Sequence, residues 1–577
     1  MTSNNIYVPN EGSPDAKLWI VGEAPGFYET IDKKPFVGDS GRLLDETLFR
    51  HGIDRNSCFI TNLCHFQPTG NKFDNLFNTK VRKGKKTTKE KPDYDSPKVE
   101  LQQGLLELDS LLQRHKPNLI VALGAWPLYY LTEKDGIGDF RGSILSTKYN
   151  QKVIATYHPA AILRSPIDYT IFDLDFKRIA EDQHFPELRT PEILYHTDYW
   201  NYRDTLCNAE YLAVDIETFV DSFVIRCIGF AYSATEAVVV PHDDSFEARE
   251  FIQCIFNSKA KFIYHNGIFD TEEERVNGYS TTDILIANYP TVRHDHDTHI
   301  QAHVLDLEMP RSLAHLTSIH TRIPYYKRSG DGEKKGWSPR TTKEELYKYN
   351  GLDCCATYEI FFKQQEALKE EGQDSIDTYE FEMQAVELSK HFTINGMLRD
   401  PVRHKIIKTY LEKERSAAIF AMYFLVGKQF NLSSPQQVAQ VLYEELKLPP
   451  RSNRTKDGGS AVTTDDDALI SLIAFTKSRK ESVKTEKAIA EWDKKFNIVK
   501  LLKKIRGLNK LLESYIDINI SGDGRVRSLY KPGATETARW SASKYIDDSG
   551  LNGQTIPRDA LEIPDKLIEE VVASCQT

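Results

Sequence analysis

The chain has 577 residues, of which 40% are apolar, and a formal net charge of -10. This length predicts about four domains with ordinary cores, and the negative charge excludes a uniformly basic nucleic-acid-binding protein. No apolar run approaches the roughly 18 residues that span a bilayer, and the N-terminus lacks the features of a signal peptide, so we expect a cytoplasmic protein without a membrane segment. The eight cysteines contain no Cys-x-x-Cys pair, which argues against a disulfide framework or a zinc site.

Residues 1–187 contain short apolar strands that each end in a polar loop. Such strands, alternating with helical segments, predict a parallel sheet covered on both faces, with a site at the carboxyl ends of the strands. We therefore expect Glu23, Asn62 and His158 to converge. The strands and the residues that follow them are Leu18–Val21 with Glu23, Phe59–Ile60 with Asn62, Leu119–Leu123 with Gly124, and Val153–Ala155 with His158.

The loops of this first region also carry recognisable motifs, and with them the region resembles the family 4 uracil-DNA glycosylases. Cleavage of an N-glycosidic bond needs a flipped base, an aromatic ring, an amide that reads the pyrimidine edge and a donor to the developing negative charge. The motifs are Gly22-Glu-Ala-Pro-Gly26, Pro35-Phe-Val-Gly38 with Gly41, Thr61-Asn62 and His158-Pro-Ala-Ala-Ile-Leu163.

The resemblance implies a role for each of these loop residues. Phe36 would stack on the base and Asn62 would read it. His158 would assist the leaving group, and Glu23 would assist the attacking water with Glu29 as a further helper. The alternative interpretation of His158 is a structural histidine before a proline.

The cysteines depart from the family pattern. Family 4 enzymes hold an iron–sulfur cluster with four cysteines, and this chain has none before Cys58. Cys58 and Cys64 cannot form a four-thiolate site alone, so we expect no iron–sulfur cluster. The sequence leaves open whether the pocket excises uracil or only binds it.

Two stretches connect this region to the next. Lys80–Lys91 is a basic, turn-rich run, which is either a solvated insertion or an arm that contacts phosphate. Residues 188–204, which contain Pro191, are predicted to be a linker.

Residues 205–370 bring carboxylates together. The strand Tyr211–Thr218 presents Asp215 and Glu217 on one face, because side chains two residues apart in a strand point the same way. Two carboxylates ~5 Å apart repel by about 3 kcal/mol at an effective dielectric constant of ~20. The pair therefore needs a proton or a cation, and a divalent metal ion is the natural choice.

Two later stretches complete the pattern. Phe262–Asp270 is a short strand followed by a turn, and Tyr349 and Asp353 share one face of a predicted helix. The order Asp-x-Glu, Asn-x-x-x-Asp and Tyr-x-x-x-Asp resembles the proofreading 3′-to-5′ exonuclease of family A DNA polymerases. This resemblance implies an RNase H-like domain with a mixed sheet.

The same resemblance implies two Mg²⁺ or Mn²⁺ ions in each exonuclease site. Asp215 would bridge both ions, and Glu217 and Asp353 would complete one site. Asp270 would hold the second ion through water, Tyr349 would orient the attacking water, and Asn266 would contact DNA.

Residues 371–577 are predicted to be mostly helical and resemble the thumb region of family A polymerases. The stretches that carry this resemblance are Asn431-Leu-Ser-Ser-Pro435, Thr535–Ala542 and Asn552–Pro557. Ser434 is predicted to cap a helix whose first residue is Pro435. A basic amphipathic helix spans Lys500–Lys510. The expected DNA contacts are Lys503, Lys504, Arg506, Lys510, Arg539 and Gln554.

Only 20 residues follow Pro557, whereas the palm and fingers of this family need on the order of ~150 residues. We therefore expect the remainder on a separate palm/fingers polypeptide or beyond an interrupted reading frame. The combination of parts resembles the DNA polymerases of large tailed bacteriophages, which implies the host cell cytoplasm as location.

The predicted fold class is α/β: a parallel-sheet domain, then a mixed-sheet domain, then a helical region. The predicted function is metal-dependent 3′-to-5′ exonuclease action on DNA primer ends within a partial polymerase. Two alternatives are a non-catalytic subunit that binds primer-template and uracil, and a uracil-DNA glycosylase as the main activity.

Overall fold

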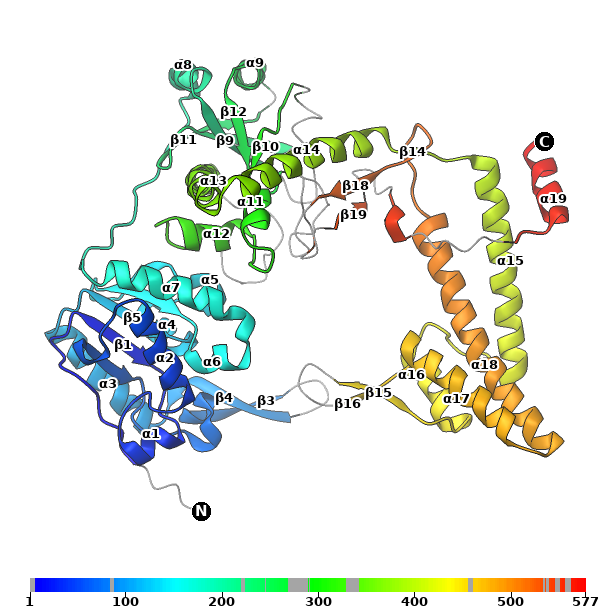
Figure 1. Cartoon of the computed structure of the whole chain (residues 1–577), viewed down its shortest axis with the longest axis horizontal. Helices are drawn as coiled ribbons and strands as arrows, with labels where there is room; N and C mark the ends of the chain where they lie inside the picture. The colour runs from blue at the N-terminus through cyan, green and yellow to red at the C-terminus, as the bar shows by residue number, and fades with distance from the viewer. Residues whose placement is uncertain are drawn as a thin grey trace. The chain divides into compact units, whose positions relative to one another are not determined.

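The computed structural model describes the chain apart from residues 1–5, 84–87, 219–223, 244, 268–288, 290, 328–341, 455–459, 533–534, 536–538, 545–549, 556–561 and 577 (Figure 1). The chain divides into two compact units. The first is Met1–Glu387 with Pro532–Arg539, and the second is Leu388–Lys531 with Trp540–Thr577. No helix in the described ranges is long and apolar enough to cross a membrane.

A five-stranded sheet with the order β2-β1-β5-β7-β6 forms the centre of the amino-terminal part. The first four strands are parallel and β6 is antiparallel, which confirms the predicted parallel sheet. All residues of the four parallel strands are buried because apolar clusters cover both faces. The strands are β1 (Leu18–Gly22), β2 (Cys58–Asn62), β5 (Leu119–Leu123), β6 (Ile144–Ser146) and β7 (Lys152–Thr156), and the longer helices are α2 (Asp39–Arg50), α3 (Val99–Arg114), α4 (Ala125–Thr132) and α7 (Tyr169–Asp182).

Buried charges join α7 to this sheet. The Nε of Arg141 donates to both oxygens of Asp175, at 3.0 and 3.1 Å, and the hydroxyl of Thr156 donates to the same carboxylate at 2.7 Å. Two turns further along α7, Asp182 lies 3.3 Å from the Nζ of Lys152. The side chains of both acids are at most 1% exposed, so each depends on its partner for compensation of its charge.

Parts of the basic run Lys80–Lys91 belong to two antiparallel strands. Strand β3 (Phe77–Lys83) pairs with β4 (Thr88–Pro97), and residues 84–87 between them lie outside the described residues. The aromatic rings of Phe77 and Tyr94, at the base of the hairpin, pack on Trp126 at 5.0 and 5.2 Å between ring centres.

A six-stranded mixed sheet follows, with the order β13-β12-β9-β10-β11-β8. Strands β9, β10 and β11 form an antiparallel meander, and β12 adds to β9 in parallel. Strand β8 lies within the stretch predicted to be a linker and pairs with β11. The bounds are β8 (Leu194–His196), β9 (Tyr211–Thr218), β10 (Ile225–Ala231), β11 (Glu236–Pro241), β12 (Lys261–Tyr264) and β13 (His296–Asp297).

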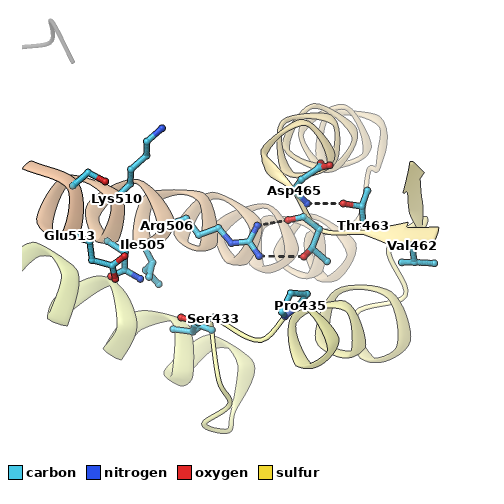
Figure 2. A pocket seen from close by; sticks show the side chains of 13 residues that line it. Ser433, Pro435, Val462, Thr463, Asp465, Ile505, Arg506, Lys510 and Glu513 are labelled. Atoms are coloured by element: carbon cyan, nitrogen blue, oxygen red, sulfur yellow. Dashed lines mark hydrogen bonds between the residues drawn. The ribbon is translucent and has the colours of Figure 1, made fainter. Parts of the chain in front are cut away.

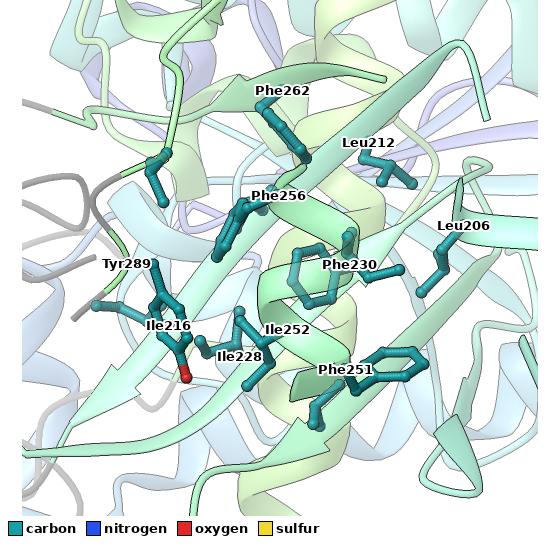
Figure 3. Packing of buried hydrophobic residues seen from close by; sticks show 14 of the residues in the cluster. Leu206, Leu212, Ile216, Ile228, Phe230, Phe251, Ile252, Phe256, Phe262 and Tyr289 are labelled. Atoms are coloured by element: carbon teal, nitrogen blue, oxygen red, sulfur yellow. The ribbon is translucent and has the colours of Figure 1, made fainter. Parts of the chain in front are cut away.

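Helices cover both faces of the mixed sheet. On one face, α9 (Phe246–Phe256) packs Ile252 and Phe256 against Phe230 and Phe262 (Figure 3). On the other face lies α13 (Lys343–Glu371), which Thr342 and Glu345 begin with a reciprocal capping box.

The close approach of α13 to the sheet depends on Gly229 in β10. A Cβ atom there would lie 2.3 Å from Asn350 Oδ1 and 2.5 Å from Cys354 Sγ. Glycine thus lets α13 lie directly over the strand that pairs with β9. Further helices in this part are α11 (Thr298–Leu305) and α12 (Leu313–His320).

The second compact unit is mostly helical, as predicted. Helix α18 (Glu486–Leu511) packs against α15 (Pro401–Val426) and α17 (Asp466–Ser482) around an apolar core. Ser434 accepts a hydrogen bond from the backbone N–H of Gln437, and Pro435 opens α16 (Pro435–Ala439). The predicted helix start is therefore confirmed.

Candidate functional site

The polar loops at the carboxyl edge of the first sheet converge, as the sequence predicts. A Cβ atom at Gly22 would lie 2.4 Å from Asn62 Oδ1 and 2.5 Å from Phe36 Cζ. The rings of Phe36 and His158 stack with their centres 5.7 Å apart. The aromatic ring and the amide therefore approach the backbone of β1 where only glycine leaves room.

Phe36 has an unusual backbone conformation. Its φ angle of 53° lies in the left-handed region, which costs a non-glycine residue on the order of 1–3 kcal/mol. The Glu29 carboxylate accepts the backbone N–H groups of Phe36 and Gly26, and Gly41 leaves room for the Phe36 carbonyl. Glu29 thus fixes the loop that presents the ring. From the sequence we expected Glu29 only to help Glu23 with the attacking water.

Glu23 and His158 both lie close to Gly124. A Cβ atom at Gly124 would lie 2.7 Å from Glu23 Oε1 and 3.3 Å from His158 Cβ. Burial raises the pKa of Glu23 to about 7, against the opposing effect of the Trp126 backbone N–H. A pKa near neutrality suits a proton acceptor.

His158 is held in one tautomer. Its Nδ1 accepts the backbone N–H of Ala160 at 3.1 Å, so Nε2 carries the proton and can donate it. Burial, and then the charge of Arg164, lower the pKa of His158 to about 4. The ring therefore caps the short helix α6 (Pro159–Arg164) as a structural histidine would, and also remains a neutral donor.

The two cysteines of this region do not fit an iron–sulfur cluster. Burial raises the pKa values of Cys58 and Cys64 to about 11. Their Sγ atoms point to the carbonyl oxygens of Asp54 and Phe66. Two cysteines cannot supply the four thiolates that such a cluster needs.

The second candidate site is a cluster of carboxylates between β9 and α13. Asp215 and Glu217 on β9 and Asp353 on α13 each offer an oxygen, and these atoms lie within 4.8 Å of one another. Desolvation, and then the charge of Asp353, raise the pKa of Asp215 to about 8. Three hard oxygen donors with excess negative charge fit a divalent cation such as Mg²⁺.

The structure describes two of the three remaining residues that were predicted for this site. Tyr349 lies on α13 one turn before Asp353, as expected, whereas Asp270 lies outside the described residues. Asn266 lies two residues after the end of β12 with a φ angle of 57°, and its backbone N–H donates to Asp297 Oδ1 at 3.0 Å. Its side-chain oxygen is buried and has no hydrogen-bond partner among the described atoms.

Three polar residues of the carboxylate site were missed in the sequence. Asn350 Nδ2 donates to Asp215 Oδ2 at 2.8 Å, and the Tyr326 hydroxyl donates to Asp353 Oδ1. Lys327 Nζ lies 2.6 Å from Asp353 Oδ2. The helical spacing of Asn350 and Asp353 was a usable signal, whereas Tyr326 and Lys327 lie in an irregular segment without periodicity.

The predicted DNA-binding residues between positions 371 and 577 fall into two groups. Arg506 donates to the Thr464 carbonyl and hydroxyl oxygens, and Lys504 pairs with Glu414 at 2.6 Å, so both have structural partners. Lys510 is exposed and lines a pocket of about 580 Å³ together with Arg506 (Figure 2). Lys503 is half-buried on the same helix, Arg539 is exposed, and the side chain of Gln554 lies outside the described residues.

Comparisons with known proteins assign two parts of the chain. Residues 9–182 match the uracil DNA glycosylase superfamily, and residues 403–560 match DNA polymerase family A. The type-4 uracil-DNA glycosylase of Sulfurisphaera tokodaii is 33% identical over 183 residues, which are 30% of this chain and 73% of that protein.

The polymerase relatives are longer than this chain. The DNA polymerase I of Borreliella burgdorferi is 26% identical over 338 residues, covering 56% of this chain and 35% of that protein. The DNA polymerase I of Mycobacterium leprae is 53% identical over 57 residues, covering 10% and 6%. The chain thus spans about a third or less of the DNA polymerase I relatives that it matches.

Proposed function

The chain belongs to the uracil DNA glycosylase superfamily through residues 9–182, and from this premise we propose that it processes DNA at two sites. The carboxylate cluster would remove nucleotides from DNA 3′ ends, as a proofreading exonuclease does. The observation that carries this proposal is the proximity of Asp215, Glu217 and Asp353, whose oxygens lie within 4.8 Å, beside Tyr349. The polymerase family match over residues 403–560 supports a DNA substrate.

Each residue of the cluster has a chemical role in this proposal. Asp215, Glu217 and Asp353 would hold the divalent ion, which when bound stabilises the charge that develops on the phosphate. Burial and the charge of Asp353 hold the pKa of Tyr349 well above its usual value, so its phenol stays protonated and can orient water. The water oxygen loses a proton to solvent and bonds to phosphorus, and the bond to the 3′ oxygen of the shortened strand breaks. That oxygen takes up a proton and becomes the new 3′-hydroxyl.

The direct test is a nuclease assay of the purified chain. With Mg²⁺, primed and single-stranded DNA should both release mononucleotides, and chelation of the metal should stop the release. DNA that is bound but never shortened would instead support the non-catalytic subunit.

A second candidate function concerns uracil. The convergence of Phe36, Asn62, His158 and Glu23 supports a pocket for a flipped pyrimidine. Single strands should be preferred, because the unstacking cost of a few kcal/mol is already absent there.

Asn62→Ala should remove the preference for uracil over cytosine. The amide would distinguish the two pyrimidine edges by hydrogen bonding, so its loss should reduce discrimination by about 10- to 100-fold. Fluorescence anisotropy with matched single strands measures this ratio. Asn56→Ala, an exposed asparagine of the same domain, is the control. An unchanged ratio in Asn62→Ala would remove this residue from the pocket.

Excision of uracil, if Glu23 activates the water, should depend on pH. Glu23 accepts a proton only when ionised, and its pKa is about 7, so the rate of abasic-site formation should rise about tenfold per unit below neutrality and level off above it. His158, with a pKa of about 4, adds no step in this range. Alkaline cleavage of the product gives the rate, and a flat profile or an active Glu23→Gln would exclude this role.

Two further expectations stay predictions. They are the bacteriophage source and the second metal ion held by Asp270.

A further inference from the structure

We propose that Lys327 is a positioning residue of the carboxylate site and that residues 9–182, here called the glycosylase-like domain, hold it there. This inference rests on the proposed nuclease function of that site. Lys327 Nζ donates to Asp353 Oδ2 and to the Tyr349 hydroxyl oxygen, each at 2.6 Å. The ammonium also lies 4.4 Å from the centre of the Tyr349 ring and 5.4 Å from that of Tyr326.

These contacts give Lys327 two effects on the site. Because the ammonium donates to the phenol oxygen of Tyr349, the phenol hydrogen is left to point at another acceptor, such as the attacking water. The ammonium also compensates one negative charge of the three-carboxylate cluster, which lowers the repulsion towards an incoming phosphate. The ammonium competes with a bound cation for the negative charge of Asp353. Each oxygen of this carboxylate still has a second lone pair that can bind the cation.

Residues 318–327 form the segment that carries Lys327 to the site. After α12 ends at His320, this segment has no helix or strand of its own, so tertiary contacts fix its path. Arg178 of α7 donates to the carbonyl oxygens of Ile319 at 3.0 Å and Thr321 at 2.7 Å. Arg322 of the segment donates to Asp182 of α7 at 2.9 Å.

The contacts with the glycosylase-like domain continue up to the residue before Tyr326. Arg141 donates to the Ser318 hydroxyl at 3.0 Å, and the Tyr325 N–H donates to the Ser143 hydroxyl at 3.3 Å. The Tyr325 ring packs edge-on against Phe140, with 4.8 Å between the ring centres. These contacts attach five residues of the segment to the glycosylase-like domain. Ile323 packs instead with Ala356 and Ile360 of α13, and the last two residues enter the carboxylate site.

A test must separate positioning from simple stabilisation of the fold. Lys327→Ala should lower kcat for nucleotide release by about 10²-fold with little change in KM for DNA, because the substrate still binds but Tyr349 loses its orientation. The Lys327→Arg variant keeps the positive charge and N–H donors. Its kcat should therefore be at least about tenfold higher than that of Lys327→Ala. Lys363→Ala removes an exposed lysine of α13 and should match the wild type.

Binding of Mn²⁺ by calorimetry provides a readout that does not depend on activity. Removal of the competing ammonium should make Lys327→Ala bind Mn²⁺ several-fold more tightly than the wild type. A site that has merely lost its structure would bind the ion more weakly. Weaker binding combined with lost activity would therefore overturn the positioning role.

Arg322→Ala tests the attachment to the glycosylase-like domain. It should lower kcat about tenfold while leaving the affinity for uracil-containing strands unchanged. Full activity in Arg322→Ala would overturn the attachment, and full activity in Lys327→Ala would overturn the role of the lysine while the proposed nuclease function stands. A wild type that releases no nucleotides would overturn both.

Discussion

Replacement of both Asp215 and Glu217 by alanine is expected to abolish nucleotide release while leaving DNA binding nearly intact. The two carboxylates supply two of the three clustered ligands, and charge stabilisation by a bound metal ion is worth several kcal/mol. The rate should therefore fall by at least about 10³-fold. Binding should tighten slightly at low salt, because two negative charges no longer repel the phosphates.

The control is a second double variant, which also removes two negative charges but at exposed positions elsewhere in the same domain. Asp204 and Glu210 are exposed, and their replacement by alanine should leave the rate within about twofold. The rate is measured from the shortening of a labelled strand and the affinity by anisotropy. Substantial nuclease activity in the Asp215→Ala, Glu217→Ala variant would reject the metal-site assignment.

Asp175→Ala should strongly destabilise the parallel-sheet domain. The Asp175 side chain is 1% exposed and pairs with Arg141, which is 2% exposed. Removal of the acid leaves a buried guanidinium without its counter-charge, which costs about 3–5 kcal/mol. The midpoint of the corresponding thermal transition should fall by roughly 10 °C.

Asp173→Ala on the same helix is the matched control. Asp173 is 30% exposed and pairs with Arg50 near the surface, where an ion pair is worth about 1 kcal/mol or less. Differential scanning calorimetry separates the two variants. Equal midpoints would show that the Arg141–Asp175 pair contributes little to stability.

The elements that could be predicted from sequence are those with local patterns. Leu119–Leu123 is an uninterrupted apolar run, and the structure contains a buried strand with the same bounds. Asp215 and Glu217 are two residues apart in a strand, and Tyr349 and Asp353 are four apart in a helix, so their shared faces follow from geometry. The motif order of a known family then placed the two elements together.

The contacts that could not be predicted join distant parts of the chain. Lys327 lies 26 residues before Asp353 in an irregular segment, and its partner is fixed by attachment to α7 rather than by any local pattern. Arg506 was expected to contact phosphate because its neighbours are basic, yet it donates to Thr464, 42 residues away. A run of basic residues indicates charge but not which side chain already has a partner.

The polarity of strand shortening tests the central claim most directly. A single strand labelled at its 5′ end, incubated with the purified chain and Mg²⁺, should give a ladder that shortens one nucleotide at a time from the 3′ end. A phosphorothioate at the last linkage should slow the first step. A labelled mononucleotide as the first product, or an intact strand with the wild type, would contradict a 3′-to-5′ exonuclease at Asp215, Glu217 and Asp353.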